Sequence, residues 1–298
     1  MKMERIAQRI VAAFIIGLSI AWVIWSINGF SLSDSQAYRA AAERLLAGQD
    51  LYVQAETQDE AFRYAPWFAA AWVPLNALPH LLGDALWAAA LFAASVAAVV
   101  PLARQERLAA RLLALLGGAM LLWTAARGNV HPLVLVALIH GIDRRSGPLW
   151  VAAAASLKAV PILFVLIYVA RRDWTKVALT VALTAALVLP MPLFGWELGS
   201  VDAGDSLSVY SLFGPVVWAA AAGLFALLAV AAALLRPRIV APATGLAAIA
   251  ALPRLLIYDL TYLLVGANEG RLTRPGGPRG WRRDSVRREW LGQKVKPG

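Results

Sequence analysis

A single lysine interrupts the apolar segment between Gly147 and Ala170. Lys158 is the only charged residue of that run, and a proline follows it three positions later. A charge at membrane depth costs several kcal/mol unless it faces a partner or a water-filled cavity, so an intramembrane cation is a candidate functional group. The alternative is that Lys158 extends its amine to the membrane surface from a helix end.

Two further cations stand beside helix-breaking residues in apolar surroundings. A glycine follows Arg127, and a proline precedes Arg254. Irregular backbone at membrane depth is tolerated where it is buried in protein or lines a cavity. These turns therefore predict that Arg127, Lys158 and Arg254 converge on a substrate site. The alternative is that each apolar pair is one tilted span with an accidental charge.

An acidic residue is expected close to these cations. Asp34 follows the first apolar segment, which runs from Ile10 to Phe30. A carboxylate that faces several cations suits the transfer of a glycosyl group from a lipid phosphate, because the acid can take a proton from an acceptor hydroxyl while the cations hold the phosphate. Phosphate is a competent leaving group, so a second carboxylate is not required. Alternatively, Asp34 is a solvated loop or helix-capping residue.

The composition places these residues in a membrane protein. Hydrophobic residues make up 60% of the 298 residues, and the mean hydropathy is +0.63, so a soluble core could not bury this much apolar surface. The first thirty residues are expected to remain as a span, because the apolar run is long for a signal peptide and lacks a cleavage site. Much of the net charge of +10 lies in residues 268–298, which predicts a disordered cytoplasmic tail against anionic lipid. This location argues against nucleic acid as a partner.

Thiol and metal chemistry have little support in the sequence. The chain has no cysteine, and its three histidines, His80, His131 and His140, are too scattered for a metal-site spacing. We expect no bound metal and no cofactor.

The distribution of charge predicts the topology. Basic residues before the first span place the N-terminus inside, so residues 31–63, with six acids and three bases, emerge outside as a short amphipathic helix and a loop. Leu45 and Leu46 are expected on the apolar side of this helix. Residues 194–211, which are acidic, are also expected outside. The basic clusters expected inside are Arg104 with Arg107 and Arg111, Arg144 with Arg145, Arg171 with Arg172, Arg236 with Arg238, and the tail.

Hairpins of short helices return the chain to the inside between these clusters. The predicted hairpins pair Leu112–Ala126 with Val130–Ile142, Leu149–Leu157 with Val160–Ala170, and Ile239–Leu252 with Leu255–Val265, each segment being too short to cross comfortably. Full spans are expected at Asp84–Ala103, Trp174–Leu193 and Leu212–Leu235. Tyr64–Leu82, which contains three prolines, is expected to be re-entrant or interfacial.

Five sequence blocks in this order resemble glycosyltransferase family 87. They are SDSQAYRAAAERLLAGQDLYV, FRYAPWFAAAWVPLNALP, RGNVHPLVLVALIHGIDRR, AAASLKAVPILFVLIYVARRDW and LPRLLIYDLTYLL, and they cover most of residues 31–264. The resemblance implies an all-α, polytopic transmembrane bundle of the GT-C type with several short broken helices. It would occupy residues 1–267, with an outer loop at 31–64.

The resemblance also implies roles for particular residues. Asp34 matches the acidic general base of the first outer loop, and Lys158 matches the lysine of the family's lysine-proline block. Arg127, Asn129 and Arg254 are assigned to the donor site or the cavity from their positions at the hairpin tips. Tyr64 and His131 lie in matching blocks and are assigned to the substrate cavity. Tyr258 and Asp259 match a tyrosine-aspartate pair, with Asp259 expected to pair with a cation such as Arg254.

The implied reaction is an inverting transfer of a hexose, usually mannose, on the extracytoplasmic side of the cell membrane. The partners would be a polyprenyl-phosphate sugar donor, a lipid or glycan acceptor and membrane lipids. The chain departs from the family's pattern where Arg127 begins its block, at Ala65 in place of a second proline, and in lacking further spans after the last block. A compact member or a missing C-terminal portion is expected. A lipid-linked sugar transporter and an inactive scaffold are the alternative functions.

Overall fold

The computed structural model describes residues 2–53, 61–196 and 208–268, and every regular element in these ranges is helical. The expected all-α architecture is therefore confirmed. Most of the acidic segment 194–211 that is expected outside (residues 197–207) and the basic residues from 269 onward lie outside the described residues, as do residues 54–60. The helices long and apolar enough to cross a membrane are α1 (Lys2–Asn28), α4 (His80–Ala103), α5 (Leu108–Ala126), α9 (Trp174–Val188, continued by a 3₁₀ turn to Phe194) and α10 (Val209–Leu235).

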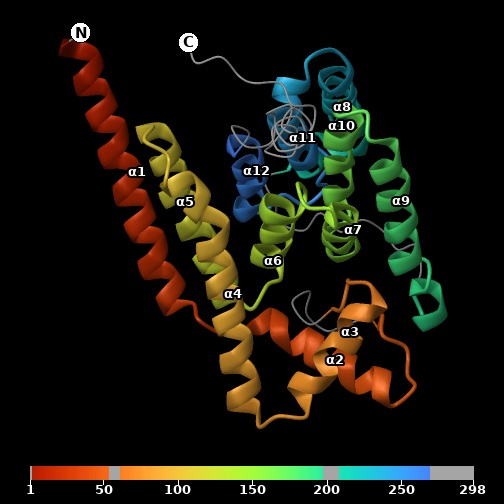
Figure 1. Ribbon diagram of the computed structural model, residues 1–298. Helices are drawn as coiled ribbons and strands as arrows, with labels where there is room; N and C mark the ends of the chain where they lie inside the picture. Colours follow the sequence, from red (N-terminus) through yellow and green to blue (C-terminus); the bar gives the residue numbers. More distant parts are fainter. Residues whose placement is uncertain (1, 54–60, 197–207, 269–298) are drawn as a thin grey trace, which may run out of the picture.

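Two shorter helices lie together at the end of the molecule opposite the N-terminus. They are α2 (Ser33–Leu46) and α3 (Pro66–Asn76), drawn in orange in Figure 1. α3 starts at a proline, which is favourable at the first helical position because its missing N–H has no partner there. The proline-rich segment thus forms a separate short helix before α4, and α2 and α3 close one end of the bundle (Figure 1).

Three helical hairpins turn where the sequence predicts. The first joins α5 to α6 (His131–Val136), which continues as a π-helical turn to Gly141. The second joins α7 (Gly147–Leu157) to the 3₁₀ helix η3 (Val160–Val165) and α8 (Leu166–Ala170). The third joins α11 (Val240–Ala250) to the 3₁₀ helix η6 (Ile257–Tyr262) and α12 (Leu263–Ala267).

Three expectations about these elements are wrong in detail. α5 begins at Leu108 and has 19 residues, so it is not too short to span a membrane. α10 is not a simple span, because Gly214 has non-helical angles (φ 81°, ψ 173°) just before Pro215 and bends the helix there. Leu46 does not share the buried side of α2 with Leu45: it is the last residue of the helix and is 68% exposed, whereas Leu45 packs against the core.

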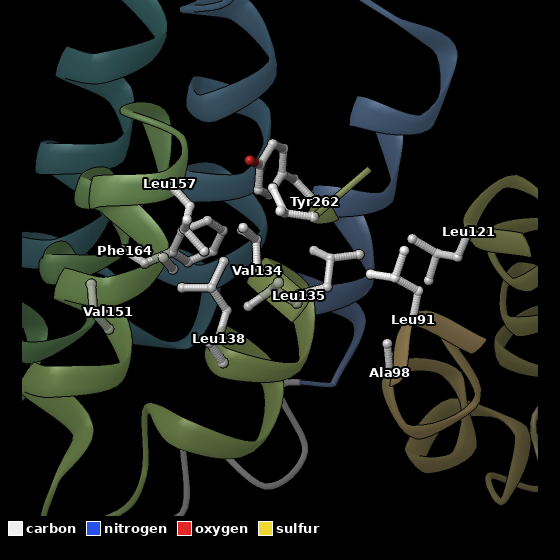
Figure 2. Packing of buried hydrophobic residues seen from close by; sticks show 14 of the residues in the cluster. Leu91, Ala98, Leu121, Val134, Leu135, Leu138, Val151, Leu157, Phe164 and Tyr262 are labelled. Atoms are coloured by element: carbon white, nitrogen blue, oxygen red, sulfur yellow. The ribbon is translucent and has the colours of Figure 1, made fainter. Parts of the chain in front are cut away.

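The core is built around α6. Figure 2 shows Val134 and Leu135 of α6, with Leu138 of the π-helical turn that follows, between Leu91 and Leu121 on one side and side chains of α7 and η3 on the other. All five of these residues are fully buried. α6, the shorter helix of the first hairpin, is thus packed on both sides. This packing holds the turn between α5 and α6 in place.

Candidate functional site

The start of α2 is joined to the end of α5 through the backbone. The N–H groups of Ser31 and Leu32 donate to the carbonyl of Ala126 at 3.1 and 3.0 Å, and the N–H of Asp34 donates to the carbonyl of Arg127 at 2.9 Å. Gly128 has a φ of +81°, and a Cβ there would lie 3.3 Å from the Cα of Leu32. Only glycine accommodates this backbone and this approach without strain, so the glycine brings Asp34 against the first hairpin turn.

Asn129 holds the carboxylate of Asp34. Its amide nitrogen Nδ2 donates to Oδ2 of Asp34, and its Oδ1 accepts the backbone N–H of His131 at 3.0 Å. Because Oδ1 is engaged by a backbone donor, the orientation of the amide is determined, and Oδ2 of Asp34 must act as an acceptor. The arrangement orients a carboxylate and keeps the proton off this oxygen.

Lys158 lies at the second hairpin turn, where the backbone is extended (φ −143°, ψ 123°) and α7 ends. Its Nζ is 3.3 Å from Oδ1 of Asp259 and lies 4.6 Å from the ring centroid of Tyr258. The other carboxylate oxygen of Asp259 accepts the N–H of Leu256 at 3.0 Å. The structure therefore sets Lys158 against Asp259, and the charge of Lys158 is partly compensated.

His131 lies behind this pair and is fully buried. Its Nε2 is 2.8 Å from Oγ1 of Thr261, whose hydroxyl donates to the carbonyl of Tyr258. The hydroxyl proton is thereby engaged, so Nε2 of His131 donates to Thr261. Its Nδ1 lies 3.9 Å from Oδ1 of Asp259 and has no hydrogen-bond partner among the described residues. His131 supports the site through its neighbours and does not line the cavity.

A cavity of about 400 Å³ opens between α2 and the three hairpin turns. Of the nine residues that the sequence assigned to a site, seven line it, and His131 and Asp259 lie behind its wall. The seven are Asp34, Tyr64, Arg127, Asn129, Lys158, Arg254 and Tyr258. The three turns thus bring their cations to one space together with the acid of the outer segment.

The sequence reasoning missed several lining residues. Tyr38 follows Asp34 by four positions on α2, and Trp123 precedes Arg127 by four on α5, so helical spacing places each on the same face as its neighbour. Arg63, counted only as one of the three bases of residues 31–63, also lines the cavity. The signal that could have found Tyr38 and Trp123 is the helical period counted from a candidate residue.

Two tyrosines of the α2 end meet at the cavity wall. The hydroxyls of Tyr38 and Tyr64 are 3.0 Å apart. Burial raises the pKa of Tyr38 well above its usual value, and burial, followed by the charge of Asp34, also raises the pKa of Tyr64. Both phenols therefore carry their protons at neutral pH and can donate hydrogen bonds.

The lining is cationic. Asp34 is the acidic residue of the lining, whereas its basic residues are Arg63, Arg127, Lys158 and Arg254. Such an excess favours an anionic ligand, and phosphate groups bind well to arginine and lysine. In the described ranges, no group of three His, Asp or Glu side chains is arranged to hold a metal ion.

Comparisons were made with protein-family models, with curated proteins and with solved structures, and none of them matches this chain. The function of this chain is therefore inferred from the cavity and from the residues that line it.

Proposed function

We propose that this chain is a membrane glycosyltransferase of the GT-C type, of the kind found in glycosyltransferase family 87. In this proposal it transfers a hexose, mannose in the first instance, from a polyprenyl-phosphate donor to a lipid or glycan acceptor. One observation carries it: Asp34, a carboxylate suited to be a general base, lines the same cavity as Arg127, Lys158 and Arg254, which are suited to a phosphate.

In the proposed reaction, Asp34 accepts the proton of an acceptor hydroxyl as that oxygen bonds to the anomeric carbon of the sugar. The bond from this carbon to the phosphate oxygen breaks, and polyprenyl phosphate leaves with the bonding electrons. Attack opposite the leaving group inverts the anomeric configuration. The hydrogen bond from Asn129 to Oδ2 supports this role, because it holds the carboxylate of Asp34 in one orientation.

The cations would stabilise the negative charge that grows on the leaving phosphate. A preorganised cation in a partly water-excluded site acts more strongly than it would in water. The proposal also includes a multi-pass arrangement in the cell membrane, with the cavity at the extracytoplasmic surface. The apolar helices support the membrane location, and the charge distribution of the flanking segments supports this orientation.

The test replaces Asp34 with Asn in the purified chain, reconstituted with polyprenyl-phosphate mannose and a lipid acceptor. Loss of a general base is expected to reduce transfer by about 10²- to 10⁴-fold while donor binding persists. Glu43→Gln is the matched control, because Glu43 is an exposed acid on the same helix and does not line this cavity. It is expected to retain activity.

Three other results would count against the proposal. Unchanged transfer by Asp34→Asn would remove this residue as the base. Movement of the lipid-linked sugar across the bilayer without a new glycoconjugate would identify a transporter instead. If the unaltered chain neither binds the donor nor transfers the sugar, it is an inactive scaffold.

A further inference from the structure

The tyrosine pair, Tyr38 and Tyr64, holds two hydroxyl groups at the cavity wall. Tyr38 stands one helical turn after Asp34, so the pair lies beside the proposed base. The two oxygens are 3.0 Å apart. The pair is thus positioned near the bond that the proposed transfer would form.

The positions of both residues are determined by packing. The ring of Tyr38 is 1% exposed and contacts Phe68 and Trp72 at centroid distances of 5.0 and 5.5 Å. The backbone of Tyr64 is held by the hydroxyl of Tyr52, which donates to the Tyr64 carbonyl at 2.7 Å. Neither hydroxyl can therefore move far to find another partner.

One proton of the pair is left over. Two phenols have two O–H protons, and the bond between them uses one. Among the described residues, neither hydroxyl has a second hydrogen-bond partner. Because Tyr38 is buried and Tyr64 is only half-buried, the consistent order is that Tyr38 donates to Tyr64, whose own proton faces the cavity. A donor of this kind favours a ligand that brings an acceptor.

We propose that the Tyr64 hydroxyl donates a hydrogen bond to a sugar hydroxyl of the ligand, and that Tyr38 is its positioning residue. This inference rests on the proposed function. A neutral phenol next to the base suits a neutral oxygen, whereas the phosphate has the cations of the lining as partners. The sugar is either the one transferred from the donor or one carried by the acceptor.

The experiment measures binding to the purified chain in nanodiscs with two sets of probes. One set is farnesyl phosphate mannose and its monodeoxy forms, and the other is an alkyl mannoside and its monodeoxy forms. The unaltered chain is expected to bind one deoxy probe about 10-fold more weakly than its parent, the effect of one lost hydrogen bond. Tyr64→Phe is expected to abolish this preference, and Tyr38→Phe is expected to reduce it.

Tyr210→Phe is the matched control, because it removes a phenol hydroxyl from α10 at a residue that packs against Trp218 of the same helix and does not line the cavity. It should leave the preference unchanged. The set in which the preference appears identifies the source of the sugar. A full preference in Tyr64→Phe, or no preference in either set for the unaltered chain, would overturn the inference.

Transfer measured in parallel separates this inference from the proposed function. Discrimination that depends on Tyr64, with no transfer by the unaltered chain, would support the sugar contact and remove the transferase. Transfer that depends on Asp34, with no effect of Tyr64→Phe on the preference, would overturn only the tyrosine assignment.

Discussion

The long helices α4 and α5, which pack against each other, differ from the outer helices α1, α9 and α10, although all five are apolar. In the most apolar stretch of α4 and of α5, 44% of the residues are buried within the protein, compared with 11% in α1 and α9 and 17% in α10. Figure 1 shows α1 and α9 at opposite edges of the molecule. Apolarity alone therefore indicates a membrane-type helix, whereas burial identifies the helices that organise the site.

The comparison predicts that the hairpin region tolerates change poorly and the outer helices tolerate it well. In the hairpin region, side chains and backbone pack against other parts of the protein. The surrounding structure therefore cannot easily adjust to the loss of a charge partner or to an added methyl group. On α10, much of the surface faces away from the described residues. Three substitutions would sharpen or break this contrast.

The largest effect is expected from Lys158→Met. It leaves the carboxylate of Asp259, whose side chain is 3% exposed, without its cation. Removing one partner of a buried ion pair typically costs about 3–5 kcal/mol of folding free energy. Unfolding of the purified protein in mixed micelles measures the change. The double variant with Asp259→Asn should recover most of the loss, and equal instability of the single and double variants would contradict the pairing.

Gly266→Ala should have an intermediate effect. A Cβ at Gly266 would lie 2.6 Å from the Cα of Pro242, so α11 and α12 must separate to admit it. Overpacking of this kind typically costs about 1–3 kcal/mol. The thermal midpoint of unfolding in detergent is expected to fall. An unchanged midpoint would show that these helices are less closely held than the packing indicates.

The smallest effect is expected from the same substitution on an outer helix, Gly223→Ala in α10. Nothing lies within 4 Å of the position of the added Cβ. Alanine favours a helix over glycine by about 0.5–1 kcal/mol, so the variant should be slightly more stable. The same unfolding measurement compares it with Gly266→Ala. A clear loss of stability would mean that α10 packs against something at this position.

Much of the local structure could be predicted from the sequence. The three hairpin turns were predicted because each contains a glycine or proline within three positions of a cation, and such signals act over a few residues. The pairing of Asp259 with Lys158 was not predicted, for the opposite reason. Arg254 is its neighbour in sequence, but Lys158 approaches it from 101 positions away. A local sequence pattern cannot predict a contact between two separate hairpins.

The same difference between neighbouring and distant residues explains which residues of the site could be predicted from the sequence. Tyr38 could have been found from its helical spacing to Asp34. The hydrogen bond between Asn129 and Asp34 could not, because it joins residues 95 positions apart. It depends on the close approach of Leu32 to Gly128, which only the packed backbone reveals.

The sequence by itself determined that this is an all-α protein with membrane-type helices, where the short helices turn, and which charged residues lie at the turns. These properties follow from composition, periodicity and helix-breaking residues, all of which act locally. Only the tertiary structure decided that Asp34, Asn129 and the three cations share one cavity, that Lys158 pairs with Asp259, and that a tyrosine pair faces the same space. These facts depend on how separate hairpins pack, and packing is set by the complementary shapes of distant segments.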